Sequence, residues 1–393
     1  LSLRRQRQMC IRDRLYVNDL FLTIVRRPLQ GHGGVIDGFL RALKGTGKAE
    51  AAAPLAADRR ELDSARDSLI SALAPYGARL LGGYDGPGGR CSEPLEFLSC
   101  LYNGEMRPVL TPQGDAGEYL PYRRASFGHE TLELSRAGAL ARGFGSMVSV
   151  KDYPAQTTPG MLDDLLRLPC EMVVTQSFGF VDRQPTLERM NLALRRMKAA
   201  DDDGLSLRAD LTRAKDDVVS GRAAFGEHHL TVLVRGESLD GLDRSTAEVM
   251  SAFTEMGAIA VREDINLEPA FWAQFPGNFK DIARKALIST ANFAGFASGH
   301  NFPVGQAGGN HWGPAVTLLE TTSAGPYHFN FHKGDLGNFT VIGPSGSGKT
   351  VVLNFLLAQA RKYSPRIVFF DKDRGAEIFL RAIGGRYETL RPG

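Results

Sequence analysis

The sequence is short of cysteine and has no long apolar run. Its 393 residues include four cysteines and no C-x-x-C pair, so we expect free thiols, mostly buried. No apolar stretch approaches the ~18–20 residues that cross a bilayer, and no signal peptide precedes the fold. We therefore expect a cytoplasmic protein without a transmembrane segment, whose association with a membrane would come through partners.

The chain also has little excess of charge. The net charge is +3, but five arginines and one aspartate give residues 1–14 a local charge of +4, so the remainder carries −1. Such a body is not expected to wrap a nucleic acid backbone, and contact with nucleic acid is predicted only indirectly. Residues 1–14 have no core periodicity and resemble translated sequencing-adapter read-through. We therefore interpret them as a non-native or disordered basic stretch, and a basic arm is the alternative.

The eight histidines give no ligand pattern for a metal centre. His328 and His332 lie in a strand-like run and could share a face, whereas His228 and His229 are adjacent in a predicted strand and point opposite ways. No carboxylate or cysteine joins either pair at ligand spacing. We therefore predict no histidine-based metal site.

What the sequence does contain is a complete G-x-x-x-x-G-K-[ST] phosphate loop at residues 343–350. The predicted nucleotide-binding residues are Gly343, Pro344, Ser345, Gly346, Ser347, Gly348, Lys349 and Thr350. Before the loop, the β-branched and aromatic run 339–342 predicts a buried parallel strand. After it, residues 351–360 are apolar on nearly every face, which predicts a helix wedged against a sheet. These flanks argue against a chance Gly-Ser loop that ends in Lys-Thr.

The residue types of the loop indicate ATP and Mg²⁺ as cofactors. Its glycines let the backbone wrap a phosphate, so that successive N–H groups and the helix N-terminus point at the negative charge. Lys349 is predicted to reach the β- and γ-phosphates, and the Thr350 hydroxyl is predicted to bind Mg²⁺. These two are the candidate catalytic residues.

The rest of the chain alternates between strand and helix patterns, which predicts an α/β protein. The predicted strands are 16–25, 171–178, 229–235, 258–262 and a hairpin of 316–320 with 327–331; the predicted helices are 60–74, 95–102, 186–199, 205–220 and 242–256. The stretch 229–262 resembles half of a split β-α-β unit. After residues 1–14, we expect a mixed α/β N-terminal domain at 15–300, a loop-rich hinge at 301–314 and the start of a P-loop NTPase domain at 315–393.

Several stretches of the chain resemble one family. They are residues 16–28, 176–178, 226–230, 271–279, 300–303, 310–314, the phosphate loop and 371–375. The most specific read Phe-Trp-Ala-Gln-Phe-Pro-Gly-Asn, from Phe271, and Asn-His-Trp-Gly-Pro, from Asn310. The chain is similar there to the energising ATPases of type IV secretion and conjugal-transfer machines, the VirB/TrbE/CagE class. The resemblance covers essentially everything after residue 14.

This resemblance implies a mixed α/β N-terminal domain followed by a RecA-like P-loop motor domain related to FtsK and HerA. It also implies a homo-oligomer, often a hexamer, that works with other subunits of the machine at the cytoplasmic face of the bacterial inner membrane. There, ATP hydrolysis would drive pilus assembly and substrate export. Two alternatives stay open: a DNA-translocating ATPase of the FtsK/HerA kind, and a nucleotide-responsive assembly scaffold.

One departure from the family concerns the end of the chain. The sequence stops at Gly393, early in the motor, whereas the family's Walker B strand, glutamate base and arginine finger come later. We therefore expect a fragment that binds ATP weakly and is inactive alone.

Asp371 is a false candidate for the Walker B aspartate. It follows four apolar residues, 367–370, but the next residue is Lys372 and not a glutamate base. The alternative is that Asp371, Asp373 and Arg374 line the nucleotide edge or a subunit contact.

Overall fold

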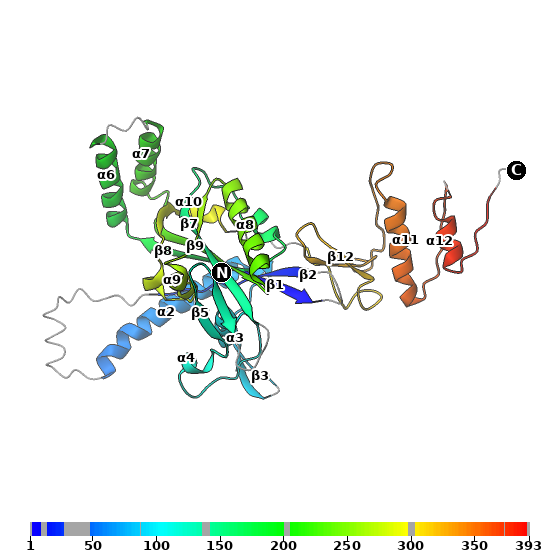
Figure 1. The fold of residues 1–393 in the computed structure, drawn as a ribbon, viewed down its shortest axis with the longest axis horizontal. Coiled ribbons are helices and arrows are strands. Elements are labelled where there is room, and N and C mark those ends of the chain that lie inside the picture. The colour runs from blue at the N-terminus through cyan, green and yellow to red at the C-terminus, as the bar shows by residue number, and fades with distance from the viewer. Residues whose placement is uncertain are drawn as a thin grey trace. The chain divides into compact units, whose positions relative to one another are not determined.

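The chain divides into two compact units (Figure 1). The computed structural model describes residues 2–8, 14–26, 48–86, 88–135, 142–199, 205–297, 303–372 and 374–390. The larger unit holds residues 1–6 and 18–300, and the smaller unit holds residues 7–17 and 301–393.

Most strands of the main antiparallel sheet belong to the larger unit. Together with the helices around them, they make a mixed α/β structure, as expected. The strand order is β2-β1-β8-β9-β7-β6-β5, with β10 paired to β7 and β11 paired to β9. These strands are β1 (Ser2–Gln8), β2 (Arg14–Leu20), β5 (Arg124–Phe127), β6 (Leu132–Ser135), β7 (Gly143–Asp152), β8 (Glu171–Val181), β9 (Phe225–Gly236), β10 (Ile259–Arg262) and β11 (Ala286–Ser289). A separate hairpin pairs β3 (Gly83–Gly86) with β4 (Gly89–Ser92).

The predicted split β-α-β arrangement is confirmed around β7. Strands β9 and β10 both pair antiparallel with β7, so they run parallel to each other with β7 between them. Helix α8 (Leu239–Glu255) makes the crossover. The Ser238 side chain caps this helix by accepting a 3.2 Å hydrogen bond from the N–H of Gly241. Residues 228–234 of β9 are all buried, because the central strand is covered on both faces.

The remaining helices of the larger unit surround this sheet (Figure 1). They are α2 (Lys48–Ala72), α3 (Glu93–Asn103), α4 (Ala116–Tyr119), α5 (Asp163–Arg167), α6 (Arg183–Ala199), α7 (Leu205–Val219), α9 (Leu267–Trp272) and α10 (Thr290–Gly295), with single 3-10 turns at Ala74–Tyr76 and Phe279–Asp281. The five predicted helices are present, although α2 begins before the predicted start. Helices α6 and α7 lie side by side as a hairpin.

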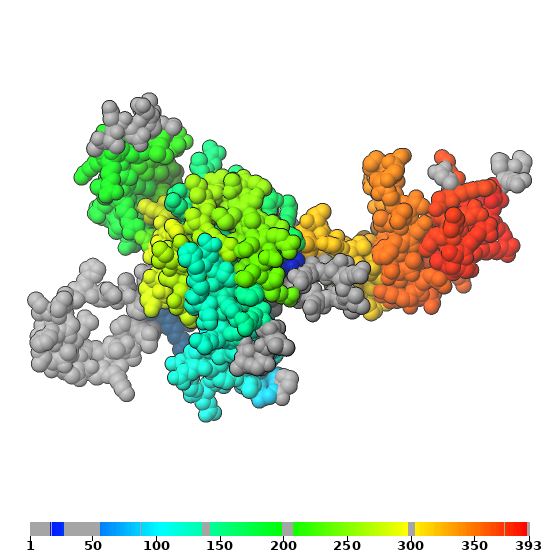
Figure 2. Space-filling view, viewed as in Figure 1, coloured from blue at the N-terminus to red at the C-terminus, as the bar shows by residue number. Residues whose placement is uncertain are grey.

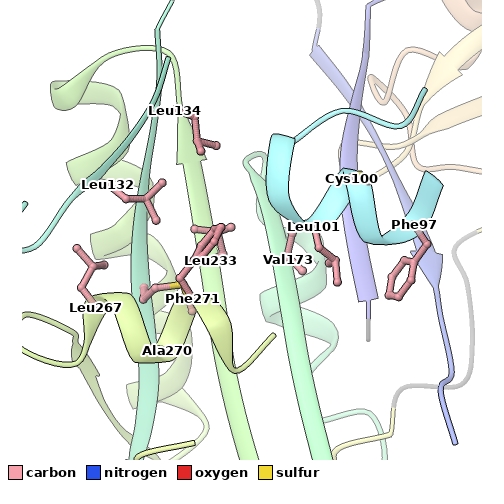
Figure 3. Packing of buried hydrophobic residues seen from close by; sticks show 11 residues of the cluster. Phe97, Cys100, Leu101, Leu132, Leu134, Val173, Leu233, Leu267, Ala270 and Phe271 are labelled. Atoms are coloured by element: carbon pink, nitrogen blue, oxygen red, sulfur yellow. The ribbon is translucent and has the colours of Figure 1, made fainter. Parts of the chain in front are cut away.

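The hydrophobic core of this unit joins α3 and α9 to the sheet (Figure 3). Its buried side chains are Phe97, Cys100, Leu101, Leu132, Leu134, Met147, Val173, Leu233, Leu267, Ala270 and Phe271. Burying one large apolar side chain contributes about 1.5–3 kcal/mol to the free energy of unfolding. Cys91, Cys100 and Cys170 are buried free thiols, as predicted, whereas Cys10 lies outside the described residues.

A buried polar network crosses the same sheet at His228, whose side chain is fully buried. The Tyr153 hydroxyl lies 2.8 Å from Nδ1 of His228, and Oε1 of Gln176 lies 3.1 Å from its Nε2. Gln176 Nε2 donates in turn to the carbonyl of Phe296, at 3.0 Å. The amide oxygen of Gln176 therefore faces the imidazole, which places the proton of a neutral His228 on Nε2.

The smaller unit has less regular structure. Its elements are the strands β12 (Thr317–Glu320) and β13 (Pro326–Phe329), the helices α11 (Lys349–Ala360) and α12 (Glu377–Ala382), and a 3-10 turn at Arg361–Tyr363. Strands β12 and β13 pair antiparallel, which confirms the predicted hairpin.

Two predictions about this unit are wrong for the described residues. The run 339–342 was predicted as a buried strand, but it pairs with no described strand, and Ile342 is 89% exposed; the apolar run 367–370 is likewise unpaired, and Phe370 is also 89% exposed. Helix α11 forms where predicted, yet Val351 is 70% exposed, so this helix is not wedged against a sheet. The physical reason is common to both: a strand needs a hydrogen-bonding neighbour, and residues 303–372 and 374–390 supply none at these runs.

Residues 2–8 differ from the disordered stretch expected there. They form β1, and Ser2, Leu3 and Arg4 pair antiparallel with Val174, Val173 and Met172 of β8. An unpaired strand edge of β8 would otherwise leave backbone N–H and C=O groups without partners. That residues 1–14 are foreign to the native protein stays a prediction.

Candidate functional site

The loop at residues 343–350 runs directly into the N-terminus of α11. Gly346 and Gly348 have φ values of 79° and 83°, in the left-handed region where glycine avoids the cost of a Cβ. A Cβ on Gly343 would lie 2.6 Å from Oγ of Ser347, so a side chain at this position would require the Ser347 hydroxyl to move. Gly348 is the N-cap residue, and its carbonyl accepts the first helical hydrogen bond, from Val352, at 3.0 Å. The free N–H groups of the first helical turn therefore lie at the end of the loop.

Lys349 folds back over this loop from the first turn of α11. Its Nζ donates to the carbonyls of Gly343 and Pro344, and both distances are 2.7 Å. An ammonium group has three donors, so one stays available to a further acceptor. The lysine therefore lies over the same loop as the glycines. The loop and α11, orange in Figure 2, form part of the surface on the face shown.

Gly375 lies beside Thr350. A Cβ built on Gly375 would be 3.4 Å from Cγ2 of Thr350. Oδ2 of Asp371 accepts hydrogen bonds from the N–H of Ala376, at 2.9 Å, and from the hydroxyl of Tyr387, at 3.3 Å. Asp373, which the sequence grouped with Asp371 and Arg374, lies outside the described residues.

The sequence reasoning missed a set of contacts at the other end of α11, which we call the connector clamp: Trp312, Pro314, Ala315, Lys362 and Tyr363. The Tyr363 hydroxyl donates to the carbonyls of Pro314, at 2.6 Å, and Ala315, at 3.1 Å. Lys362 Nζ donates to the carbonyl of Ala315 at 2.8 Å, and the Trp312 and Tyr363 rings lie 5.6 Å apart. The only signal in the sequence was an aromatic residue in each of two segments far apart along the chain.

Metal-binding groups do not gather elsewhere in the described parts of the chain. Among those residues, no three or more His, Cys, Asp or Glu side chains come together as a possible metal site. His332 stacks on His311, with ring centroids 4.4 Å apart, and Trp312 lies 5.1 Å from the same ring. Aromatic packing therefore accounts for His332. The residues that fit Mg²⁺ are those of the loop, where the Thr350 hydroxyl and bound phosphates would supply hard oxygen ligands.

Membrane-spanning helices were searched for over the same described residues. No helix among them is both long enough and apolar enough to cross a bilayer.

The fold defines a mixed α/β protein that carries a phosphate-loop sequence at the start of a helix in its smaller unit. Residues 79–284 match the CagE, TrbE, VirB family, described as a component of the type IV transporter system. The match covers more than half of the chain, and the chain belongs to this family.

Curated relatives extend the similarity over nearly the whole chain. The type IV secretion system protein virB4 of Bartonella henselae is 40% identical over 389 residues, which are 99% of this chain and 49% of the relative. The type IV secretion system protein PtlC of Bordetella pertussis is 36% identical over 399 residues, 96% of this chain and 47% of the relative. Protein virB4 of Agrobacterium tumefaciens is 34% identical over 390 residues, 98% and 48% respectively. The chain thus spans about half the length of these relatives.

Proposed function

We propose that this chain carries the phosphate-binding part of an ATPase that energises a type IV secretion or conjugal-transfer system. The observation that carries the proposal is the geometry at residues 343–350. A glycine loop runs into the N-terminus of α11, and Lys349 folds over this loop. Its Nζ donates hydrogen bonds to two carbonyls of the loop. Membership of the CagE, TrbE, VirB family supports the choice of secretion machinery.

In this proposal, the chain's own residues bind and neutralise a nucleoside triphosphate. The N–H groups at the start of α11 bind phosphate oxygens, aided by the positive end of the helix dipole. Lys349 offsets the charge of the β- and γ-phosphates as the triphosphate reacts. The Thr350 hydroxyl would hold Mg²⁺, which would supply further stabilisation of the phosphate charge when bound.

The proposal extends to the organisation of the chain. Residues 15–300 form the family-specific N-terminal domain, 301–314 the hinge and 315–393 the start of a RecA-like P-loop domain. The complete protein would assemble as a homo-oligomer, a hexamer in the form suggested by the resemblance, on the cytoplasmic side of the bacterial inner membrane. Its ATP turnover would drive pilus assembly and export together with other subunits of the machine.

The direct test is nucleotide binding by the Lys349→Ala variant. The substitution removes the cation beside the loop, so we expect binding of a fluorescent ATP analogue with Mg²⁺ to weaken by about tenfold or more. Lys280→Ala is the matched control, because it removes one exposed positive charge from the larger unit and should leave affinity unchanged. Superimposable titration curves for wild type and Lys349→Ala would refute the assignment.

A further inference from the structure

After α11, the chain returns to the phosphate loop at a turn formed by residues 374–376. Arg374 in this turn has a φ of 56°, a left-handed conformation that non-glycine residues rarely adopt, so the backbone turns sharply there. At Gly375, an added Cβ would lie 3.4 Å from Cγ2 and 3.9 Å from Oγ1 of Thr350. The turn therefore lies directly beside the side chain assigned to Mg²⁺.

Asp371 closes this turn with a single carboxylate oxygen. Its Oδ2 accepts from the N–H of Ala376, at 2.9 Å, and from the hydroxyl of Tyr387, at 3.3 Å. Ala376 is fully buried and is the N-cap residue of α12, so the first bond ties Asp371 to a fixed point at the start of α12. Hydrogen bonds to a charged acceptor are the stronger kind.

The position of the turn matters because threonine in a helix has two available side-chain rotamers. Its hydroxyl can either bond back to a carbonyl one turn earlier or point elsewhere, and the choice is made by the surroundings. Backbone at residue 375 is placed next to the methyl group of Thr350, and a displaced turn would remove that neighbour.

We infer that Asp371 is a positioning residue. It fixes the turn at residues 374–376, which places Gly375 against the methyl group of Thr350 and holds the Thr350 hydroxyl ready for Mg²⁺. This inference rests on the proposed function and adds that Asp371 acts through the turn and Thr350, and does not itself bind the metal.

The experiment separates these roles with two substitutions at one position. Asp371→Asn keeps an oxygen that accepts both hydrogen bonds but removes the charge, whereas Asp371→Ala removes the acceptor. MgCl₂ is titrated into the full 393-residue chain with a fluorescent ATP analogue, and the same binding is measured in EDTA. We expect the apparent Kd for Mg²⁺ to stay within about twofold of wild type for Asp371→Asn and to rise about tenfold for Asp371→Ala, with affinity in EDTA unchanged in both.

Each other outcome overturns the inference in a recognisable way. If Asp371→Asn weakens Mg²⁺ binding as much as Thr350→Ala, Asp371 is itself a metal ligand. If Asp371→Ala lowers only the unfolding temperature, its role is structural. If wild-type binding does not depend on Lys349, the proposed function fails first, and that result is independent of both Asp371 variants.

A second pair of variants tests the contact without touching Asp371. Gly375→Ala adds a methyl group at ordinary van der Waals distance from Thr350 and should leave the Mg²⁺ titration unchanged. Gly375→Val adds bulk on the Thr350 side and should raise the apparent Kd for Mg²⁺ several-fold, again without an effect in EDTA. Equal Mg²⁺ titrations for the two variants would contradict the inferred contact.

Discussion

At the scale of single residues, the most constrained group in the larger unit is the imidazole of His228. Burial, together with the neighbouring His229, lowers the pKa of His228 to about 3. Burial, then the charge of Lys285, lowers the pKa of His229 to about 4. Both side chains are therefore neutral in the folded protein near pH 7, which agrees with the hydrogen bonds that assign one proton to His228.

These lowered pKa values predict a loss of stability on mild acidification. In the unfolded chain both histidines bind a proton below their ordinary pKa of about 6.5, whereas the folded protein stays neutral until about pH 4, so acid favours unfolding. The free energy of unfolding should fall by about 1.4 kcal/mol per pH unit for each histidine between about pH 6.5 and pH 5. Urea unfolding followed by Trp272 fluorescence, in a Trp312→Phe background, measures this slope in the larger unit.

Removing one histidine tests the origin of the slope. His228→Gln eliminates one titrating group and should reduce the slope by about half, even though the variant is less stable at pH 7. His129→Gln is the control, since it removes a histidine of the larger unit whose side chain is largely exposed. A slope unchanged by His228→Gln would mean that other groups cause the acid sensitivity.

At the scale of elements, the end of α3 is fixed by Asn103, which is fully buried. Its Nδ2 donates to the carbonyls of Ser99 and Leu120, at 3.0 and 2.9 Å. Its Oδ1 accepts from the N–H groups of Tyr122 and Arg123, both at 3.0 Å. One amide thus joins the last turn of the helix to the segment that leads into β5.

Asn103→Ala should be strongly destabilising, because it leaves buried backbone groups without partners. We expect a loss of about 2–4 kcal/mol in the free energy of unfolding of the larger unit, measured by urea denaturation. Asn191→Ala in α6 is the control, and it should be neutral or slightly stabilising because alanine is the better helix former. A loss below about 0.5 kcal/mol for Asn103→Ala would show that water replaces the amide.

The elements that the sequence predicts well are those whose signal is local. Helix α8 has a serine cap and apolar residues at helical spacing, and β9 is rich in apolar and β-branched residues from Leu230 to Val234, so both can be predicted before any tertiary contact is known. The runs 339–342 and 367–370 are equally apolar, yet they form no strands, because strand pairing depends on neighbours that are distant in sequence. The local sequence pattern therefore predicts which conformation a segment prefers, whereas pairing with another strand decides whether a strand forms.

The candidate site shows the same division. The spacing of Gly343, Gly348 and Lys349 predicts a loop at a helix N-terminus, and the structure has one there. The spacing could not predict that Asp371 accepts hydrogen bonds from Ala376 and Tyr387. Nor could it predict that Tyr363 donates to the carbonyls of Pro314 and Ala315. These hydrogen bonds depend on how segments separated along the chain come together, which no spacing rule encodes.

At the scale of the whole molecule, the 393-residue chain should bind nucleotide weakly and hydrolyse almost none. Binding needs the loop, Lys349 and Thr350, whereas hydrolysis also needs a positioned water, a base and charge stabilisation in the transition state. An arginine finger alone is worth about 10³–10⁵ in rate. Exposed apolar side chains such as Val351 and Phe370 also favour aggregation over an ordered site.

Phosphate release by the purified chain is the measurement. It should equal the no-enzyme background, and Lys349→Ala should be indistinguishable from wild type in this assay. A protein extended to the full length of its relatives should turn over measurably and lose that turnover with Lys349→Ala. Steady, Lys349-dependent turnover by the 393-residue chain would show that its catalytic set is already complete.

The connector clamp has a mechanical consequence for the smaller unit. Hydrogen bonds between Tyr363 and Pro314, and between Lys362 and Ala315, join residues 49 and 47 positions apart and close the intervening chain into a ring. A pull on residues 314 and 315 therefore reaches the C-terminal end of α11 without passing through the β12–β13 hairpin. That helix is a rod about 18 Å long. Tension applied at one end is delivered at the other, where the loop at residues 343–350 begins the helix.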